Sequence, residues 1–146
     1  MHILVVTNET AVGHVLCDTV AAVAVPNRAD VTVVAPALNS RLRHWLSDED
    51  DARRAATERL DCCLRSLRAA GVHAIGNIGD ADPLRAIDDE LAVRSADRLI
   101  IATHPEHRSN WLEQRLVERA RAAFAIPIEH IVVDLARRVE HLAAAA

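Results

Sequence analysis

Ile3-Leu4-Val5-Val6-Thr7, an unbroken apolar run close to the start of the chain, decides the fold class. The run is short and rich in β-branched residues, and both features are typical of a buried β-strand. Four later runs have the same character, at residues 31–35, 72–75, 98–103 and 130–134. Strands without polar alternation are covered on both faces, so the five runs predict a parallel sheet between two layers of helices.

Longer stretches with helical spacing separate the five runs. Residues 10–25 are rich in alanine and valine and predict a largely buried first helix. Ser47 precedes four acidic residues, which indicates an N-cap with acids in the first turn, and Gly71 indicates the end of that helix. Asp82, followed by a proline, predicts the start of the third helix, and Ser109 the start of the fourth.

This alternation of strands and helices leaves few topologies, because crossover connections are right-handed. We predict an α/β fold of three layers, in which a doubly wound five-stranded parallel sheet has the strand order 3-2-1-4-5. Residues 1–134 are expected to form this domain, and residues 135–146 a short helical extension or a tail. No repeat or low-complexity linker divides the chain.

The charge of the chain limits its partners. The sequence has 17 basic and 21 acidic residues, and every basic residue is arginine, so mechanisms that need a catalytic or phosphate-binding lysine are excluded. A net charge of −4, with one Phe and two Trp, argues against nucleic-acid binding, which normally uses a basic face with stacking aromatics.

Hydropathy and cysteine usage favour a cytoplasmic protein without a membrane partner. No apolar run approaches the roughly 18 residues that span a bilayer, and the first residues lack the basic region of a signal peptide. The odd number of cysteines fits a reducing compartment. We expect Cys17, Cys62 and Cys63 to be small residues in or near the core rather than redox or metal groups.

In a doubly wound sheet, ligands bind beyond the carboxyl ends of the strands, where the winding direction reverses. With the predicted order, this crevice opens between the first and fourth strands, and the segment after the fourth strand leads to a helix N-terminus that could hold an anion. The polar residues expected there are Thr7, Asn8, Glu9, Thr103, His104, Arg108, Ser109 and Asn110. The alternative is that Ser109 only caps its helix and that Arg108 is solvated.

Motifs in the second half of the chain point to a family. Residues 79–87, GDADPLRAI, are similar to a Gly-Asp-Pro segment that opens a third helix, and residues 96–104, ADRLIIATH, to a strand-four signature written A-D-L-I-V-M-G-T-H. Arg-Ser at 108–109 and Ile-Pro-Ile at 126–128 follow in the matching order. In these motifs the chain resembles the universal stress protein family. The resemblance implies a Rossmann-like fold of the adenine nucleotide alpha hydrolase type, a cytoplasmic homodimer joined through the last strand, and a regulatory or stress-related role.

The departures from that family concern its ATP site. Members that bind ATP have a G-x2-G-x9-G-[ST] loop, whose glycines let backbone N–H groups approach the phosphates. Here Ala102 and Pro105 stand at the first two glycine positions, and proline has no N–H to donate. Asn8 replaces the aspartate that contacts the nucleotide. A branch of the family with Thr-His-Pro and Arg-Ser-x-Trp-Leu in place of the glycine loop resembles residues 103–105 and 108–112 most closely.

Three functions remain open from the sequence. The first is a non-catalytic regulatory module that dimerises and binds partners without a cofactor. The second is a binder of an adenine nucleotide or small anion in the crevice. The third is an enzyme. His104, His107 and Glu9 could hold a metal, and residues 11–14, AVGH, resemble a nucleotidyltransferase H/T-x-G-H signature. Neither pattern has the spacing or partner residues of a known framework. Residues 40–46, SRLRHWL, either recognise a phosphate or base or pack as a lid segment.

Overall fold

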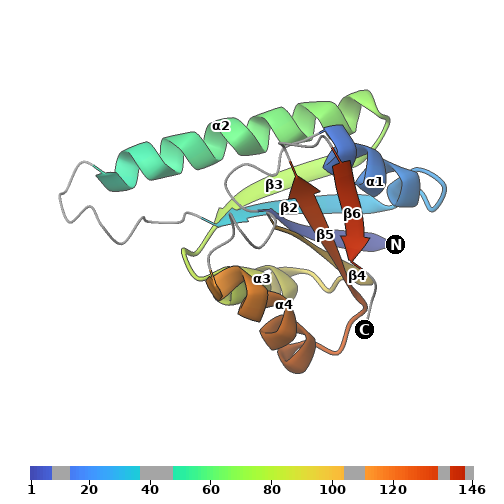
Figure 1. Cartoon of the computed structure of the whole chain (residues 1–146). Helices are drawn as coiled ribbons and strands as arrows, with labels where there is room; N and C mark the ends of the chain where they lie inside the picture. The colour runs from blue at the N-terminus through green and yellow to red at the C-terminus, as the bar shows by residue number, and fades with distance from the viewer. Residues whose placement is uncertain (8–13, 37–47, 104–110, 135–138, 144–146) are drawn as a thin grey trace.

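The structure is a computed structural model of the chain, and it describes residues 1–7, 14–36, 48–103, 111–134 and 139–143 (Figure 1). Strands and helices alternate up to the fifth strand, and one further strand follows. The elements are β1 (His2–Thr7), α1 (His14–Ala24), β2 (Asp30–Pro36), α2 (Asp48–Ala69), β3 (His73–Gly79), α3 (Pro83–Val93), β4 (Arg98–Thr103), α4 (Trp111–Ala123), β5 (Ile128–Asp134) and β6 (Val139–Ala143).

The sheet has the order β3-β2-β1-β4-β5-β6, and its first five strands are parallel. The predicted order 3-2-1-4-5 is therefore confirmed. β1 lies at the centre: Ile3 pairs with Val31 of β2 on one side and with Arg98 of β4 on the other. The winding direction reverses between β1 and β4, so the switch point lies where the sequence predicted it.

The structure differs from the expectation at the C-terminal extension. Residues 139–143 form β6, which pairs antiparallel with β5 from Asp134↔Val139 to His130↔Ala143. A strand here satisfies the backbone groups along the outer side of β5, which would otherwise be an open sheet edge. The described part of the extension, residues 139–143, is therefore a sixth strand of the same sheet and not a helix.

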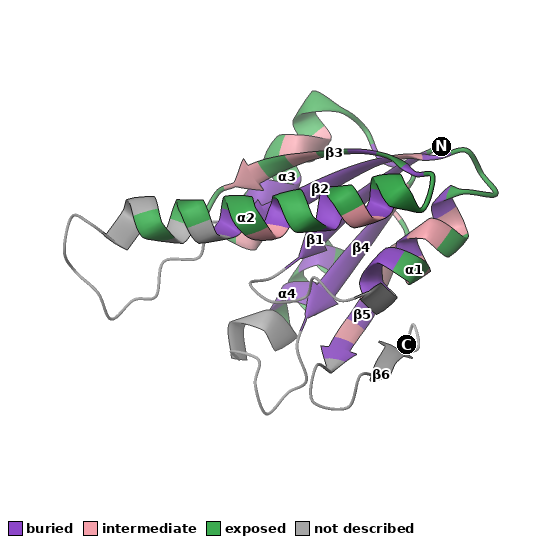
Figure 2. Ribbon diagram, turned by 90° about the horizontal axis from the view of Figure 1, so that it is seen from above, coloured by how far each residue is buried: buried purple, intermediate pink, exposed green. Residues whose placement is uncertain are grey.

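Two clusters of apolar side chains cover the two faces of the sheet. On one face α1 and α2 pack against Ile3 and Val5, which we call the α1/α2 cluster. On the other face α3 and α4 pack against Leu4 and Val6, which we call the α3/α4 cluster. Figure 2 shows β1 and β4 buried along their length between the two helical layers. No helix in the described part of the chain is both long and apolar enough to cross a membrane.

Two helix ends follow their sequence signals, whereas the predicted N-caps Ser47 and Ser109 lie outside the described residues. Asp82 caps α3, with its side-chain oxygen accepting from the N–H of Leu84 at 3.0 Å, and the next residue is the proline at the first helical position. Gly71 has a φ of 86°, which only glycine adopts without strain, and it follows the last turn of α2.

A buried histidine fastens the start of the central strand. His2 is 6% exposed; its Nδ1 lies 2.8 Å from the carbonyl oxygen of Ser95, and its Nε2 lies 2.9 Å from the hydroxyl of Thr32. A carbonyl only accepts, so in the neutral ring Nδ1 carries the proton and Nε2 accepts from Thr32. The backbone N–H of His2 also donates to Asp97 at 2.7 Å. These contacts tie β1 to β2 and to the turn before β4.

Candidate functional site

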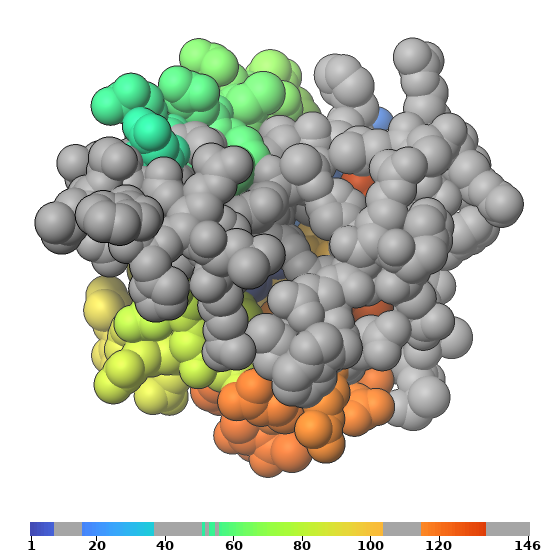
Figure 3. All heavy atoms as spheres, turned by 60° about the vertical axis from the view of Figure 1, so that its left-hand side comes forward, coloured from blue at the N-terminus to red at the C-terminus, as the bar shows by residue number. Residues whose placement is uncertain are grey.

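The carboxyl edge of the sheet brings two of the predicted site residues onto neighbouring strands. Thr7 is the last residue of β1 and pairs with Ala102 of β4, and Thr103 is the next residue and the last of that strand. Both threonines are 4% exposed. Figure 3 views the molecule from this side, where described atoms of α2, α3 and α4 border the face. The other predicted site residues, Asn8, Glu9, His104, Arg108, Ser109 and Asn110, lie outside the described residues.

The two threonine side chains belong to opposite faces of the sheet. Thr7 continues the alternate series of Ile3 and Val5, which lies in the α1/α2 cluster. Thr103 continues the series of Leu99 and Ile101, which lies in the α3/α4 cluster. Because successive side chains of a strand point to opposite faces, the hydroxyls are not directed into one common space. One ligand could contact both only by lying across the edge of the sheet.

Thr103 has a partner that the sequence did not predict. Its hydroxyl oxygen lies 2.7 Å from Nε2 of His130, a half-buried histidine of β5. Burial holds the pKa of His130 below its ordinary value, and the positive charge of Arg121 on α4 adds to this effect. The ring is therefore neutral near pH 7, and it either accepts from or donates to the threonine hydroxyl. The sequence signal for this contact was His130 itself, a polar residue in the otherwise apolar run 130–134. Its partner on β4 could not be predicted, because it depends on the register between β4 and β5.

Among the helices that begin on this side of the sheet, two follow the strands on either side of the switch point. α1 starts at His14 after the segment that follows β1, and α4 starts at Trp111 after the segment that follows β4. In a parallel α/β unit each helix runs back against its strand, so both helix N-termini lie at the carboxyl edge. The partial positive charge of a helix N-terminus favours an anionic group there. Backbone geometry thus favours an anion over a cation at this edge.

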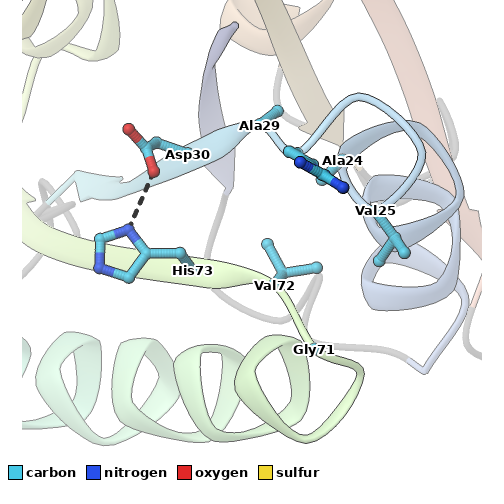
Figure 4. A pocket seen from close by; sticks show the side chains of 8 residues that line it. Ala24, Val25, Ala29, Asp30, Gly71, Val72 and His73 are labelled. Atoms are coloured by element: carbon cyan, nitrogen blue, oxygen red, sulfur yellow. Dashed lines mark hydrogen bonds and ion pairs between the residues drawn. The ribbon is translucent and has the colours of Figure 1, made fainter.

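A described pocket lies at the opposite, amino edge of the sheet. It has a volume of about 220 Å³ and is open to solvent between the starts of β2 and β3 and the ends of α1 and α2 (Figure 4). The pocket is lined by Ala24, Val25, Arg28, Ala29, Asp30, Gly71, Val72 and His73. It is smaller than the roughly 300–1,000 Å³ of ordinary ligand pockets, and helix C-termini repel anions.

Two of the titratable groups that line this pocket, Asp30 and His73, are already paired. Asp30 contacts Arg94 at 2.8 Å and His73 at 3.0 Å. The hydrogen bond from Arg94, then that from His73, lowers the pKa of Asp30. This network joins β2, β3 and the end of α3, and a structural role accounts for it.

The structure gives no support to a metal centre among the residues that it describes. Within those ranges no group of three or more His, Cys, Asp or Glu side chains is arranged to hold a metal ion. The metal alternative of the sequence involved His104, His107 and Glu9, and all three lie outside the described residues.

Comparison with known proteins adds evidence on the fold. No family model and no curated protein matches the chain. Among solved structures, a protein of the universal stress protein family from Burkholderia pseudomallei aligns over 89% of this chain and 94% of its own, with a TM-score of 0.65 and 13% identity.

Two further solved structures were determined with nucleotides. A universal stress protein in complex with cAMP covers 88% of this chain and 95% of its own, with a TM-score of 0.62 and 13% identity. A universal stress protein family protein from Arabidopsis thaliana with AMP bound covers 94% of this chain and 95% of its own, with a TM-score of 0.55 and 13% identity. The strand order, the two helical layers and these alignments together establish that the chain has the fold of the universal stress proteins.

Proposed function

We propose that this chain is a divergent universal stress protein that works as a non-catalytic regulatory module in the cytoplasm, by dimerisation and partner binding. One observation carries the proposal: the fold is that of the universal stress proteins, yet the residues at and just after the end of β4 lack the first two glycines of the family's phosphate loop. Ala102 stands at the first glycine position of that loop, is 2% exposed and packs in the α1/α2 cluster. Three residues later Pro105 removes a further N–H donor.

The proposed dimer joins two copies through the last strand. The sequence placed this seam on the fifth predicted strand, residues 130–134, but β6 pairs with that strand in the structure. The proposal therefore moves the seam to β6, which forms the sheet edge beyond β5. An edge strand presents unpaired N–H and C=O groups along its outer side, which a second copy can pair with around a two-fold axis. A symmetric pair of β6 strands would place residues near the strand centre, such as His141, close to their own copies.

Light scattering over a range of concentrations tests the dimer, and a cysteine at position 141 tests its location. In a Cys62→Ala background, which removes the exposed native thiol, His141→Cys should form a covalent dimer on mild oxidation. Asn27→Cys, on the exposed turn after α1, serves as the matched control and should not. A monomer at every concentration would refute the dimer, and efficient cross-linking of the control alone would place the contact elsewhere.

Binding of an adenine nucleotide is the second candidate function. The observation that favours it is that two structures with this fold contain cAMP and AMP. A monophosphate needs fewer backbone donors than a triphosphate, so the loss of the glycine loop disfavours ATP more than AMP. The crevice residues proposed for this role include Asn8, Arg108 and Ser109.

Thermal unfolding with AMP, cAMP, ATP and inorganic phosphate tests this second candidate. A ligand at about 100 times its dissociation constant should raise the free energy of unfolding by about 2.7 kcal/mol. Arg108→Ala should remove the shift, whereas Arg59→Ala, on a helix away from the crevice, should retain it. If none of the four ligands shifts the melting temperature, nucleotide binding is rejected while the dimer proposal stands.

A further inference from the structure

An arginine side chain binds the backbone of β3, the strand at the sheet edge opposite to β6. Nε and Nη2 of Arg68, near the end of α2, both donate to the carbonyl oxygen of Ala74, at 3.1 Å and 2.9 Å. A carbonyl oxygen has two lone pairs, so these two donors use its full accepting capacity. The direction of this carbonyl decides whether the contact affects the sheet edge.

The backbone hydrogen bonds of the neighbouring strands fix that direction. The N–H of Asp30 donates to the carbonyl of Met1 at 3.0 Å, so Asp30 turns its backbone groups toward β1. Successive residues of a strand turn theirs to opposite sides, so Val31 faces β3. In a parallel ladder a residue bonds to the two neighbours of its partner, and the partner of Val31 is Ala74. The N–H and C=O of Ala74 itself therefore point outward, away from the sheet.

α2 reaches this edge because a glycine lies beneath it. A Cβ atom at Gly76 would lie 2.6 Å from Cδ1 of Leu60 and 3.0 Å from Cδ1 of Leu64, so the missing side chain lets α2 pack directly on the edge strand (Figure 1). Leu60, Leu64 and Arg68 are spaced four residues apart and form one stripe along the helix. The two leucines hold α2 over β3, and the next position of the stripe brings the guanidinium group to the outward carbonyl.

The guanidinium group lies where another strand would pair. An added strand runs about 4.7–4.9 Å away and bonds to the outward backbone groups, which by alternation are those of Ala74, Gly76 and Ile78. The two donor nitrogens occupy this space beside Ala74. In a two-fold pair of β3 strands centred on Gly76, Ala74 of each copy faces Ile78 of the other. Arg68 therefore interrupts two of the three outward pairings.

We propose that Arg68 caps the β3 edge, so that two copies of this chain cannot pair through it and β6 is left as the edge open to a second copy. Charged side chains and covering helices protect sheet edges in general, and α2 supplies both. A sheet with two open edges adds copies at both and grows into an extended assembly. The cap thus ends assembly at two copies. The restriction to β6 rests on the proposed dimer, whereas the cap on β3 does not.

Removal of the guanidinium group tests the cap. Arg68→Ala is compared with Arg65→Ala, which removes the same side chain from an exposed position about one turn earlier in the same helix. Light scattering over a range of concentrations measures the molar mass, with a reductant present because Cys62 is exposed. At high concentration Arg68→Ala should reach about twice the molar mass of the wild type or more, since a second edge becomes available. Arg65→Ala should match the wild type.

Residue-resolved hydrogen–deuterium exchange locates the new contact. The outward amides of Ala74, Gly76 and Ile78 should exchange more slowly in concentrated Arg68→Ala than in the same variant after dilution. Equal molar mass and equal β3 exchange in the Arg68 and Arg65 variants at every concentration overturn the proposal. So does association of Arg68→Ala in which no β3 amide gains protection.

Two controls keep the outcomes distinct. Circular dichroism verifies that each variant is folded, and Arg68→Met, which keeps an aliphatic stem on the helix, carries the test if Arg68→Ala unfolds. A wild type that is monomeric at every concentration rejects pairing through β6. Association of Arg68→Ala through β3 supports the cap even then, so failure of the proposed dimer and failure of the cap give different results.

Discussion

At Gly79 the end of β3 comes so close to α3 that no side chain fits. A Cβ atom at this position would lie 2.6 Å from Cβ of Ala86 and 2.8 Å from Cγ1 of Val34. Both neighbours are buried, at 1% and 0% exposure, so neither can move aside freely. The glycine that opens the family-like motif 79–87 is thus required by the packing of a strand against a helix, independently of any ligand.

We expect Gly79→Ala to lower the free energy of unfolding by about 1–3 kcal/mol, as overpacking of a core generally does. Urea denaturation measures the loss. The double variant Gly79→Ala/Ala86→Gly removes one of the two clashing groups and should recover part of it, although a glycine within α3 costs about 1 kcal/mol by itself. A single variant as stable as the wild type would show that β3 and α3 lie farther apart.

His130 makes the stability depend on pH. Its pKa is lower in the folded state, where burial and Arg121 disfavour the imidazolium, than the ordinary value of 6.5 in the unfolded chain. The unfolded state therefore binds the proton more tightly, and the free energy of unfolding should decline as the pH falls through about 6.5, with no contribution from this group well above that value.

His130→Gln keeps a polar group beside Thr103 but cannot titrate, so its stability should change less between pH 7.5 and 5.5 than that of the wild type. Chemical denaturation at several pH values provides the comparison. All other titratable residues are the same in the two proteins, so their contributions cancel in the difference. If the two proteins lose equal stability over this range, His130 is not the group with the depressed pKa.

Among the elements, α3 shows how a start signal in the sequence becomes a contact. The side chain of Asp82 accepts from the N–H of Leu84, while Asp80 accepts from the N–H of Asp82. Removing an N-cap carboxylate leaves a helix donor without its partner, which typically costs about 1 kcal/mol. We therefore expect Asp82→Ala to lower the free energy of unfolding by about this amount in urea denaturation. Asp89→Ala, which removes an exposed acid from the same helix, should change it by less than about 0.5 kcal/mol.

The elements also show where sequence reasoning succeeds and where it fails. The run Ile3–Thr7 is apolar on both faces, so its burial between two layers follows from its own residues. The strand at 139–143 was not predicted because nothing local demands it: its pairing partner is β5, and the benefit is the closing of that strand's open edge. Secondary-structure propensity describes a segment by itself, whereas the formation of an added edge strand depends on the neighbouring strand with which it pairs.

For the whole molecule, topology predicts more of the candidate site than side-chain geometry does. The strand order alone places Thr7 and Thr103 on adjacent strands at the same edge. Their opposite orientations depend on the pleat, and the bond between Thr103 and His130 depends on the register of β4 with β5. Register is a property of the assembled sheet, which explains why the sequence located the edge but not the contacts made there.

The assembled sheet also predicts a gradient of local stability. All six residues of β1 are buried and the strand is paired on both sides, so exchange of its amides requires large-scale unfolding. β6 pairs with β5 through five residues on one side only, and β3, the other edge, pairs through seven and is covered by α2. Hydrogen–deuterium exchange should therefore be slowest in β1, intermediate in β3 and fastest in β6. Amide protection of β6 equal to that of β1 at every protein concentration would contradict this order. If the protection of β6 is lost on dilution, a second copy covers this edge, as the proposed dimer requires.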